Sequence, residues 1–191
     1  EELEEHVTRW DTADYDVYFA LATFENSDTR EAVNAQYLRS LFVDMDGYET
    51  KKAAAEAITT FMDRVGLDLL GTPYIVGSGG GLHVYWPFTE DVAVDRWKPL
   101  AEGLKRLCKQ EGLKIDMTVT ADAARVLRVP GTRNHKKKYG TPKPVRILTE
   151  GDTFAFEDLE SLIISQLKSQ VLPMPTPTLR LEGVRPTSVS A

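Results

Sequence analysis

An α+β fold, in which helices pack on an antiparallel or mixed sheet, is the architecture that this sequence predicts. Short β-rich stretches alternate with amphipathic helical stretches along 191 residues, a length that suffices for one substantial core. The glycine-rich segment at 78–81 joins two β-rich stretches, which indicates antiparallel pairing. A hydrophobic content of 42% and a charged content of 27% are ordinary for a globular protein.

The first third of the chain is predicted to contain two strands and one helix. Residues 16–24 are β-rich and should form a strand, and a polar loop follows at 25–34. A second strand is expected at about 38–46, where apolar residues dominate. Residues 51–65 carry apolar side chains at helical spacing, and Gly66 should end that helix.

The middle third is predicted to contain a hairpin and a long helix. Residues 73–77 and 82–88 are the two β-rich arms of the glycine-rich hairpin. A helix should run from about 94 to 111 and end at Gly112. Cys108 falls within the apolar pattern of this helix, which favours a packed thiol over a reactive one.

The last third is predicted to contain two short strands, at 114–117 and 145–149, and a final helix at 156–169. A helical turn is expected at 121–127. Proline, serine and threonine then replace the core-forming pattern, so residues 171–191 should be a linker or tail. The expected domain is therefore residues 1–170.

Two aspartates at the end of a predicted core strand are the most informative residues in the chain. Asp44 and Asp46 follow three apolar residues, and alternate residues of a strand share a face. Their carboxylates should therefore lie about 7 Å apart. Like charges at that separation raise each other's pKa or need a cation between them, and an all-oxygen site suits Mg²⁺. The alternative is a strand that runs into an ordinary Asp-Gly turn.

A third acid and a histidine extend this candidate site. Asp116 lies in a predicted short strand, and three strand-borne acids can share a metal pair that serves phosphoryl transfer. Asp122 fits the start of a helical turn better than a ligand position. The glycines before His83 should let the backbone approach a ligand. His83 would then donate to a phosphate oxygen or carry a proton, whereas a structural histidine is the alternative.

Positive charge is concentrated in one segment of an otherwise acidic chain. The net charge is −6, yet residues 125–146 contain eight Lys or Arg and no Asp or Glu. Such a local basic segment suits an anionic ligand, although a solvated charge run is the alternative. Arg125 and Arg128 are expected to share a face of the predicted helical turn, and the Pro-Gly-Thr sequence that follows should form a sharp turn.

The sequence predicts an intracellular protein without a membrane segment. No apolar run approaches the length that spans a bilayer, and the acidic N-terminus does not resemble a secretory signal. A single cysteine excludes an internal disulfide and fits the reducing cytoplasm.

Four motifs together resemble the catalytic core of the archaeo-eukaryotic primase superfamily, in its primase-polymerase branch of phages, plasmids and mobile elements. The motifs are LFVDMD at 41–46, SGGGLHVYW at 78–86, KID at 114–116 and RVPGTRNHK at 128–136. The resemblance covers about residues 15–150 and implies an RRM-like sheet core. The family often has a serine two positions before the histidine, and this chain departs from that pattern with Gly81.

The resemblance implies a role for each candidate residue. Asp44, Asp46 and Asp116 would bind two Mg²⁺ or Mn²⁺ ions, and His83 would contact the phosphates of the incoming nucleotide. The triphosphate or template backbone would be held by Arg128 and further by Arg125, Asn134, Lys136 and Ser78. Single-stranded template would be gripped by Arg133, Lys136, Lys137, Lys138 and Lys143. Base stacking by Trp86 or Tyr139 is less favoured than packing.

The predicted function is that of a template-directed DNA primase-polymerase, which adds NTPs or dNTPs to a 3′-hydroxyl during DNA replication. Expected partners are single-stranded DNA template, primer and nucleoside triphosphate, and a helicase or a C-terminal helical domain of a longer protein is plausible. The alternatives are a metal-dependent nuclease and a DNA-binding replication module without catalytic activity.

Overall fold

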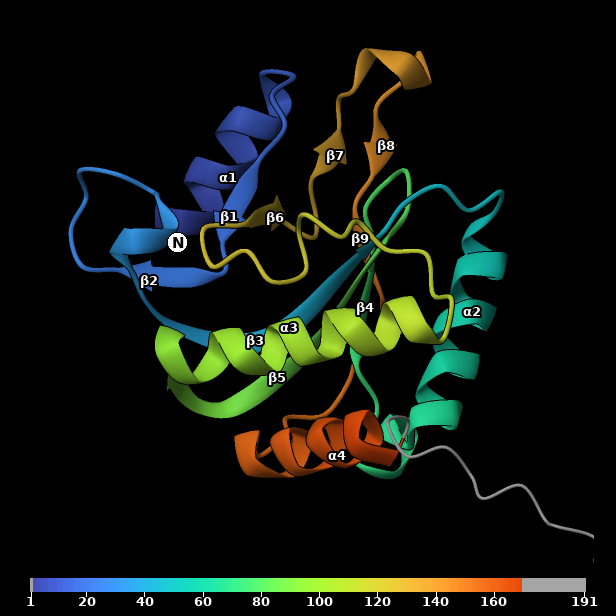
Figure 1. Ribbon diagram of the computed structural model, residues 1–191. Helices are drawn as coiled ribbons and strands as arrows, with labels where there is room; N and C mark the ends of the chain where they lie inside the picture. The colour runs from blue at the N-terminus through green and yellow to red at the C-terminus, as the bar shows by residue number, and fades with distance from the viewer. Residues whose placement is uncertain (1, 170–191) are drawn as a thin grey trace, which may run out of the picture.

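A five-stranded antiparallel sheet forms the centre of the protein (Figure 1). The computed structural model describes residues 2–169, so the predicted tail at 171–191 lies outside the described residues. The sheet contains, in spatial order, β2 (Ala22–Phe24), β3 (Ala35–Met45), β5 (Leu82–Ala93), β4 (Tyr74–Gly77) and β9 (Arg146–Thr149). Every neighbouring pair in this sheet is antiparallel, which confirms the predicted α+β class.

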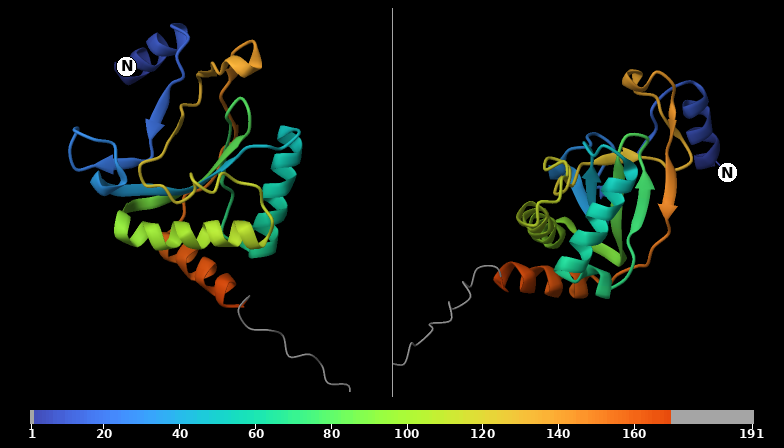
Figure 2. Two further views of the ribbon diagram at one scale, coloured as in Figure 1. Left: turned by 45° about the horizontal axis from the view of Figure 1, so that its top comes forward. Right: turned by 90° about the vertical axis from the view of Figure 1, so that its right-hand side faces the viewer.

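Three helices cover one face of the sheet (Figure 2). They are α2 (Lys51–Val65), α3 (Val94–Gln110) and α4 (Phe156–Ser169). The side chain of Thr50 accepts the backbone N–H of Ala53 at the start of α2, and Gly66 ends that helix with a φ of 75°. None of the helices described for residues 2–169 is long and apolar enough to cross a membrane.

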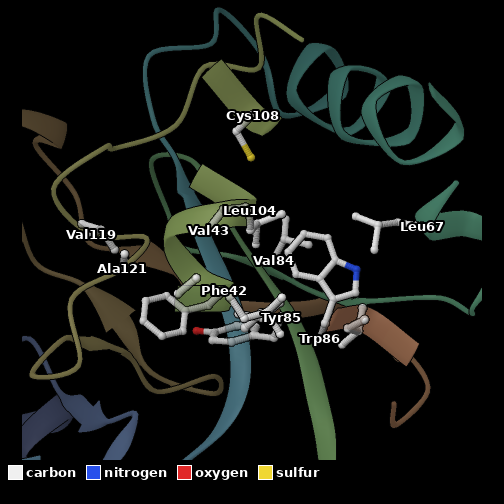
Figure 3. Packing of buried hydrophobic residues seen from close by; sticks show 14 of the residues in the cluster. Phe42, Val43, Leu67, Val84, Tyr85, Trp86, Leu104, Cys108, Val119 and Ala121 are labelled. Carbon is white, nitrogen blue, oxygen red and sulfur yellow. The ribbon is translucent and has the colours of Figure 1, made fainter. Parts of the chain in front are cut away.

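The core lies between these helices and the two longest strands. Figure 3 shows part of it, including Val43 and Val84 from the sheet and Leu104 from α3. The Phe42 ring stacks on Trp97 of α3 at a centroid distance of 5.8 Å. The indole N–H of Trp97 donates to the carbonyl of Ser40 at 2.9 Å, so α3 is fixed to β3 by packing and by a buried hydrogen bond.

Two short strand pairs lie on the side of the protein away from α4 (Figures 1 and 2). β1 (Tyr18–Ala20) pairs with β6 (Val126–Arg128), and β7 (Arg133–Asn134) pairs with β8 (Lys143–Pro144). The remaining elements are α1 (Glu2–Thr12) and the short 3₁₀ turns η1 (Ala32–Asn34), η2 (Leu67–Leu69) and η3 (Lys137–Tyr139). We call residues 133–144, which comprise β7, η3 and β8, the basic hairpin.

Two of the predicted elements are wrong, one because of a local turn and the other because of a long-range strand pairing. Residues 114–117 form no strand, because the Asp116 side chain accepts the N–H of Thr118 and folds the chain into turns. Residues 121–127 form no helical turn, because the last of them pair with β1 in an extended conformation. The predicted strand at 16–24 is divided at Leu21, where the chain leaves β6 and joins β3.

The other predicted elements are present, with different limits in places. The helices at 51–65 and 156–169 have the predicted bounds. β5 extends to Ala93, beyond the predicted end at residue 88. The sequence interpretation did not anticipate α1.

The glycine-rich loop between β4 and β5 is packed against other parts of the protein. An added Cβ would touch Asn134 at Gly79, the hydroxyl of Tyr139 at Gly80, and both the carbonyl of Met45 and a carboxylate oxygen of Asp46 at Gly81. The glycines therefore let β3 and the basic hairpin approach the loop. This packing is enough to explain the glycines of the loop. The predicted close approach of a ligand is not needed to explain them.

We predict that Gly81→Ala destabilises the protein much more than Gly80→Ala. Neither glycine has a positive φ, so the two variants differ mainly in what the new methyl group meets. At Gly81 it overlaps backbone, whereas at Gly80 it meets the end of a tyrosine side chain that can turn aside. Urea unfolding should show a loss of about 1–3 kcal/mol for Gly81→Ala. Equal losses in the two variants would contradict this explanation.

Candidate active site

Asp44 and His83 face each other across the two central strands. They are direct partners in the β3–β5 register, so their side chains project from the same face of the sheet. His83 Nε2 lies 3.9 Å from Asp44 Oδ1, and the side chains are only 3% and 17% exposed. Because they alternate with Val43 and Val84 along the strands, they point away from the helix-covered face.

Two more carboxylates lie close to Asp44. Asp46 follows β3 directly, and the backbone N–H of Asp116 donates to the carbonyl of Asp44 at 2.7 Å. Burial, and then the charges of Asp46 and Asp116, raise the pKa of Asp44 to about 7, although Lys136 and Arg125 oppose the shift. The structure thus brings the three predicted acids together.

The environment of Asp44 fits a bound cation. Its Oδ1 atom is buried and makes no hydrogen bond within the described residues, which is costly for a carboxylate. Yet among residues 2–169 no three His, Cys, Asp or Glu side chains form a complete metal-binding group. Asp116 Oδ1 is already engaged by the N–H and hydroxyl of Thr118, at 2.9 and 2.6 Å. The acids therefore offer part of a coordination shell, which water or phosphate oxygens must complete.

His83 is held as a neutral imidazole. Burial, and then the positive charges of Arg128 and Lys136, lower its pKa to about 4. Its Nδ1 atom lies 3.3 Å from the hydroxyl of Tyr85, which leaves Nε2 toward Asp44. A neutral ring can still donate one hydrogen bond to a ligand. Both predicted roles of His83, as a donor to phosphate and as a proton carrier, stay predictions.

The two predicted arginines reach the site in different ways. Arg128 lies in β6, and its side chain is 7% exposed and paired with Asp16 at 2.8 Å. Arg125 precedes β6 and pairs with Asp122 at 3.2 Å, so the two arginines do not share a helical face as predicted. Arg125 lowers the pKa of both Asp44 and Asp116, which places its charge beside the acids.

Ser78 and Asn134 are buried supports of the glycine-rich loop. The hydroxyl of Ser78 accepts the N–H of Gly81 at 3.1 Å. The side-chain amide of Asn134 donates to the Ser78 carbonyl at 2.9 Å and accepts the N–H of Lys136 at 3.1 Å. These contacts give Ser78 and Asn134 a structural role that needs no nucleotide. Contact of either residue with a bound nucleotide stays a prediction.

The basic residues divide into an anchored arginine and exposed lysines. The side chain of Arg133 donates to the carboxylate of Asp11 at 3.0 Å. Exposed lysines of the basic hairpin are Lys136, Lys137, Lys138 and Lys143. The ammonium groups of Lys138 and Lys143 lie 5.0 and 4.9 Å from the centre of the Tyr139 ring. Trp86, the other candidate for base stacking, is fully buried in the core (Figure 3).

Four residues that shape the site were not anticipated from the sequence. Asp11 and Asp16 hold basic residues more than 100 positions away, Tyr18 contacts Arg128, and Tyr85 contacts His83. No local pattern marks Asp11, Asp16 or Tyr18, because the tertiary fold alone brings their partners near. Tyr85 lies two positions after His83 on the same strand, so strand alternation could have indicated it.

Comparison with known proteins gives one sequence relative and similar solved structures. The chain is 30% identical over 131 residues, 67% of its length, to a "Replication protein" of Clostridium perfringens, and it spans 31% of that protein. No family model matches the chain.

Two similar solved structures are a primase-polymerase domain and a polymerase domain. The AEP domain of the cyanophage S-2L primase-polymerase superposes with a TM-score of 0.62 at 18% identity, over 83% of this chain and 76% of that one. The polymerase domain of Mycobacterium tuberculosis ligase D, in complex with DNA, gives a TM-score of 0.47 at 17% identity, over 80% and 60% of the two chains.

We predict that Asp44→Asn stabilises the metal-free protein at high pH. The folded pKa of about 7 exceeds the ordinary value of 3.8, so wild-type stability falls as the pH rises through this window. The asparagine variant should therefore gain up to about 4 kcal/mol above pH 7 and nothing below pH 4. Thermal melts in a chelator across pH 4–8 test this. A pH-independent difference in Tm would show that Asp44 is not a buried charge.

Proposed function

We propose, from the premise that the chain has the fold of the archaeo-eukaryotic primase-polymerase domain, that it is a template-directed nucleotidyltransferase of DNA replication. In this proposal it adds NTPs or dNTPs to a 3′-hydroxyl, as a DNA primase or DNA-directed polymerase. The fold likeness to the S-2L AEP domain supports the premise. The likeness to a replication protein supports the biological setting.

The observation that carries the proposal is the unpaired oxygen of Asp44 between two acids and a group of cations. Asp46 and Asp116 raise the pKa of Asp44, whereas Lys136 and Arg125 lower it. Acids that need a cation, together with the nearby positive charges of Lys136 and Arg125, suit a metal-bound triphosphate. A buried site with only one sign of charge would not.

The charge of each site residue sets the role that it would have. Asp44, Asp46 and Asp116 would hold Mg²⁺ or Mn²⁺, which when bound activates the 3′-hydroxyl and stabilises the leaving pyrophosphate. His83, neutral and fixed by Tyr85, would donate a hydrogen bond to a phosphate oxygen. Arg128 and Lys136, whose charges reach His83, would balance the triphosphate. Fixed groups of this kind stabilise charge without reorganising.

Single-stranded DNA is the proposed template ligand of the basic hairpin. Asn134 joins the basic hairpin to the glycine-rich loop, and the two lie side by side (Figure 1). The exposed lysines of the hairpin can contact the backbone of a strand that enters the site. A helicase partner and a C-terminal helical domain remain proposals, because the chain spans 31% of the replication protein that it matches.

We predict that synthesis requires the acids of β3. Wild-type protein, incubated with single-stranded DNA, Mn²⁺ or Mg²⁺ and labelled dNTPs or NTPs, should extend an annealed primer. Asp44→Asn and Asp46→Asn should each reduce extension at least about 100-fold, whereas Asp68→Asn, at an exposed acid of η2, should not. Products formed without a primer would add priming activity.

Two outcomes would replace the proposal. Metal-dependent loss of labelled DNA without added nucleotide would favour the nuclease, since three acids and a histidine also suit hydrolysis. DNA binding without any metal-dependent product would favour the binding module.

We predict that the salt dependence of DNA binding depends on the lysines of the basic hairpin. Lys137→Gln and Lys138→Gln should each reduce the slope of log affinity against log salt by about 0.7. Lys52→Gln, at an exposed lysine of α2 paired with Glu56, is the matched control and should leave the slope unchanged. Fluorescence anisotropy of a labelled oligonucleotide measures it. Equal slopes in all variants would remove the basic hairpin from the DNA interface.

A further inference from the structure

We infer that Asp16, together with Tyr18, is a positioning residue that presents Arg128 to the phosphates of a bound nucleotide. The inference rests on the proposed function and adds residues outside the four motifs. It comes from the way in which one nearly buried arginine is held.

Two of the three guanidinium nitrogens of Arg128 are bound by other residues of the protein. Asp16 accepts Nη2 at 2.8 Å and Nε at 3.3 Å, as a carboxylate does in a two-point pair. The hydroxyl of Tyr18 accepts Nη2 at 2.7 Å, and its ring lies 4.9 Å from the guanidinium carbon. These contacts use Nε and Nη2, and none of the hydrogen bonds within residues 2–169 involves Nη1, so its two N–H groups are left for a ligand.

Strand pairing and a backbone hydrogen bond fix the residues that hold Arg128. Tyr18 and Arg128 are partners in the β1–β6 register. Asp16 Oδ1 also accepts the backbone N–H of His135 at 2.7 Å. One carboxylate thus joins the strand that carries Arg128 to the start of the basic hairpin. A side chain held in this way loses little conformational entropy on binding.

Arg128 lies beside the face of the sheet that carries His83, as contacts of its partner strand β1 show. The ring of Phe19 in β1 lies 6.5 Å from the ring of Tyr85. The hydroxyl of Tyr85 lies 3.3 Å from His83 Nδ1, and His83 itself faces Asp44. Arg128 therefore lies where a phosphate bound by the acids' metal would need a donor.

The direction in which Asp16→Asn changes nucleotide affinity distinguishes a positioning role from a purely electrostatic one. Removing a carboxylate near a polyanion site makes the local potential more positive, so Asp16→Asn should tighten nucleotide binding if only charge matters. If Asp16 positions Arg128, the same variant should weaken binding. A role confined to folding would change Tm and leave the KM of the folded fraction unchanged.

The experiment measures the KM and kcat for dNTP in primer extension, together with Tm. Asp16→Asn should raise KM about tenfold, a loss expected when a charge-assisted hydrogen bond is misaligned, with a smaller change in kcat. Asp16→Glu should recover part of the loss. In an Arg128→Lys background, Asp16→Asn should have little further effect, because its target is gone.

Glu157→Gln is the matched control, since Glu157 of α4 also pairs with an arginine, Arg96 of α3, at 3.1 Å but on the helix-covered face of the sheet. It should leave KM unchanged. If Asp16→Asn does not fold, Tyr18→Phe removes one acceptor of Arg128 and should still raise KM. An unchanged or lowered KM in Asp16→Asn, with active wild type, overturns this inference alone. Wild type that incorporates no nucleotide overturns it together with the proposed function.

Discussion

The burial of Asp44 beside two other carboxylates is the constraint on which the arrangement of the site depends. A carboxylate oxygen without a hydrogen bond in a largely buried position costs free energy. Local strand geometry requires this position, because Asp44 is the direct partner of His83 between two core residues of β3. The cost is tolerable only if positive charge is supplied nearby. Lys136 and Arg125 supply part of it, and a metal ion bound with substrate would supply the rest.

The rest of the fold brings that positive charge to the end of β3. Gly81 lets the β4–β5 loop pack directly on Met45 and Asp46. Asn134 fixes the basic hairpin to this loop. Lys136 therefore lies near the acids. On the other side, β1 supports the strand that carries Arg128. The acidic and basic groups therefore come from separate elements, and each is held by packing that does not involve a ligand.

Local patterns were sufficient to predict much of the fold, and failed where tertiary contacts decide. The helix at 51–65 follows from its apolar spacing and from Gly66, both of which are local. Residues 121–127 look helical by composition, yet β1 draws the end of this segment into a strand. The acidic pair is visible in the sequence because strand periodicity places it. Asp16 is not, because its partner lies 112 residues away.

The most direct test of the central claim is to locate Mn²⁺ by anomalous diffraction in crystals that contain dATP. The account predicts metal bonded to carboxylate oxygens of Asp44 and Asp46, with triphosphate oxygens completing the shell on the side of His83 and Arg128. Metal that binds only elsewhere, or dATP that binds away from these acids, would contradict it.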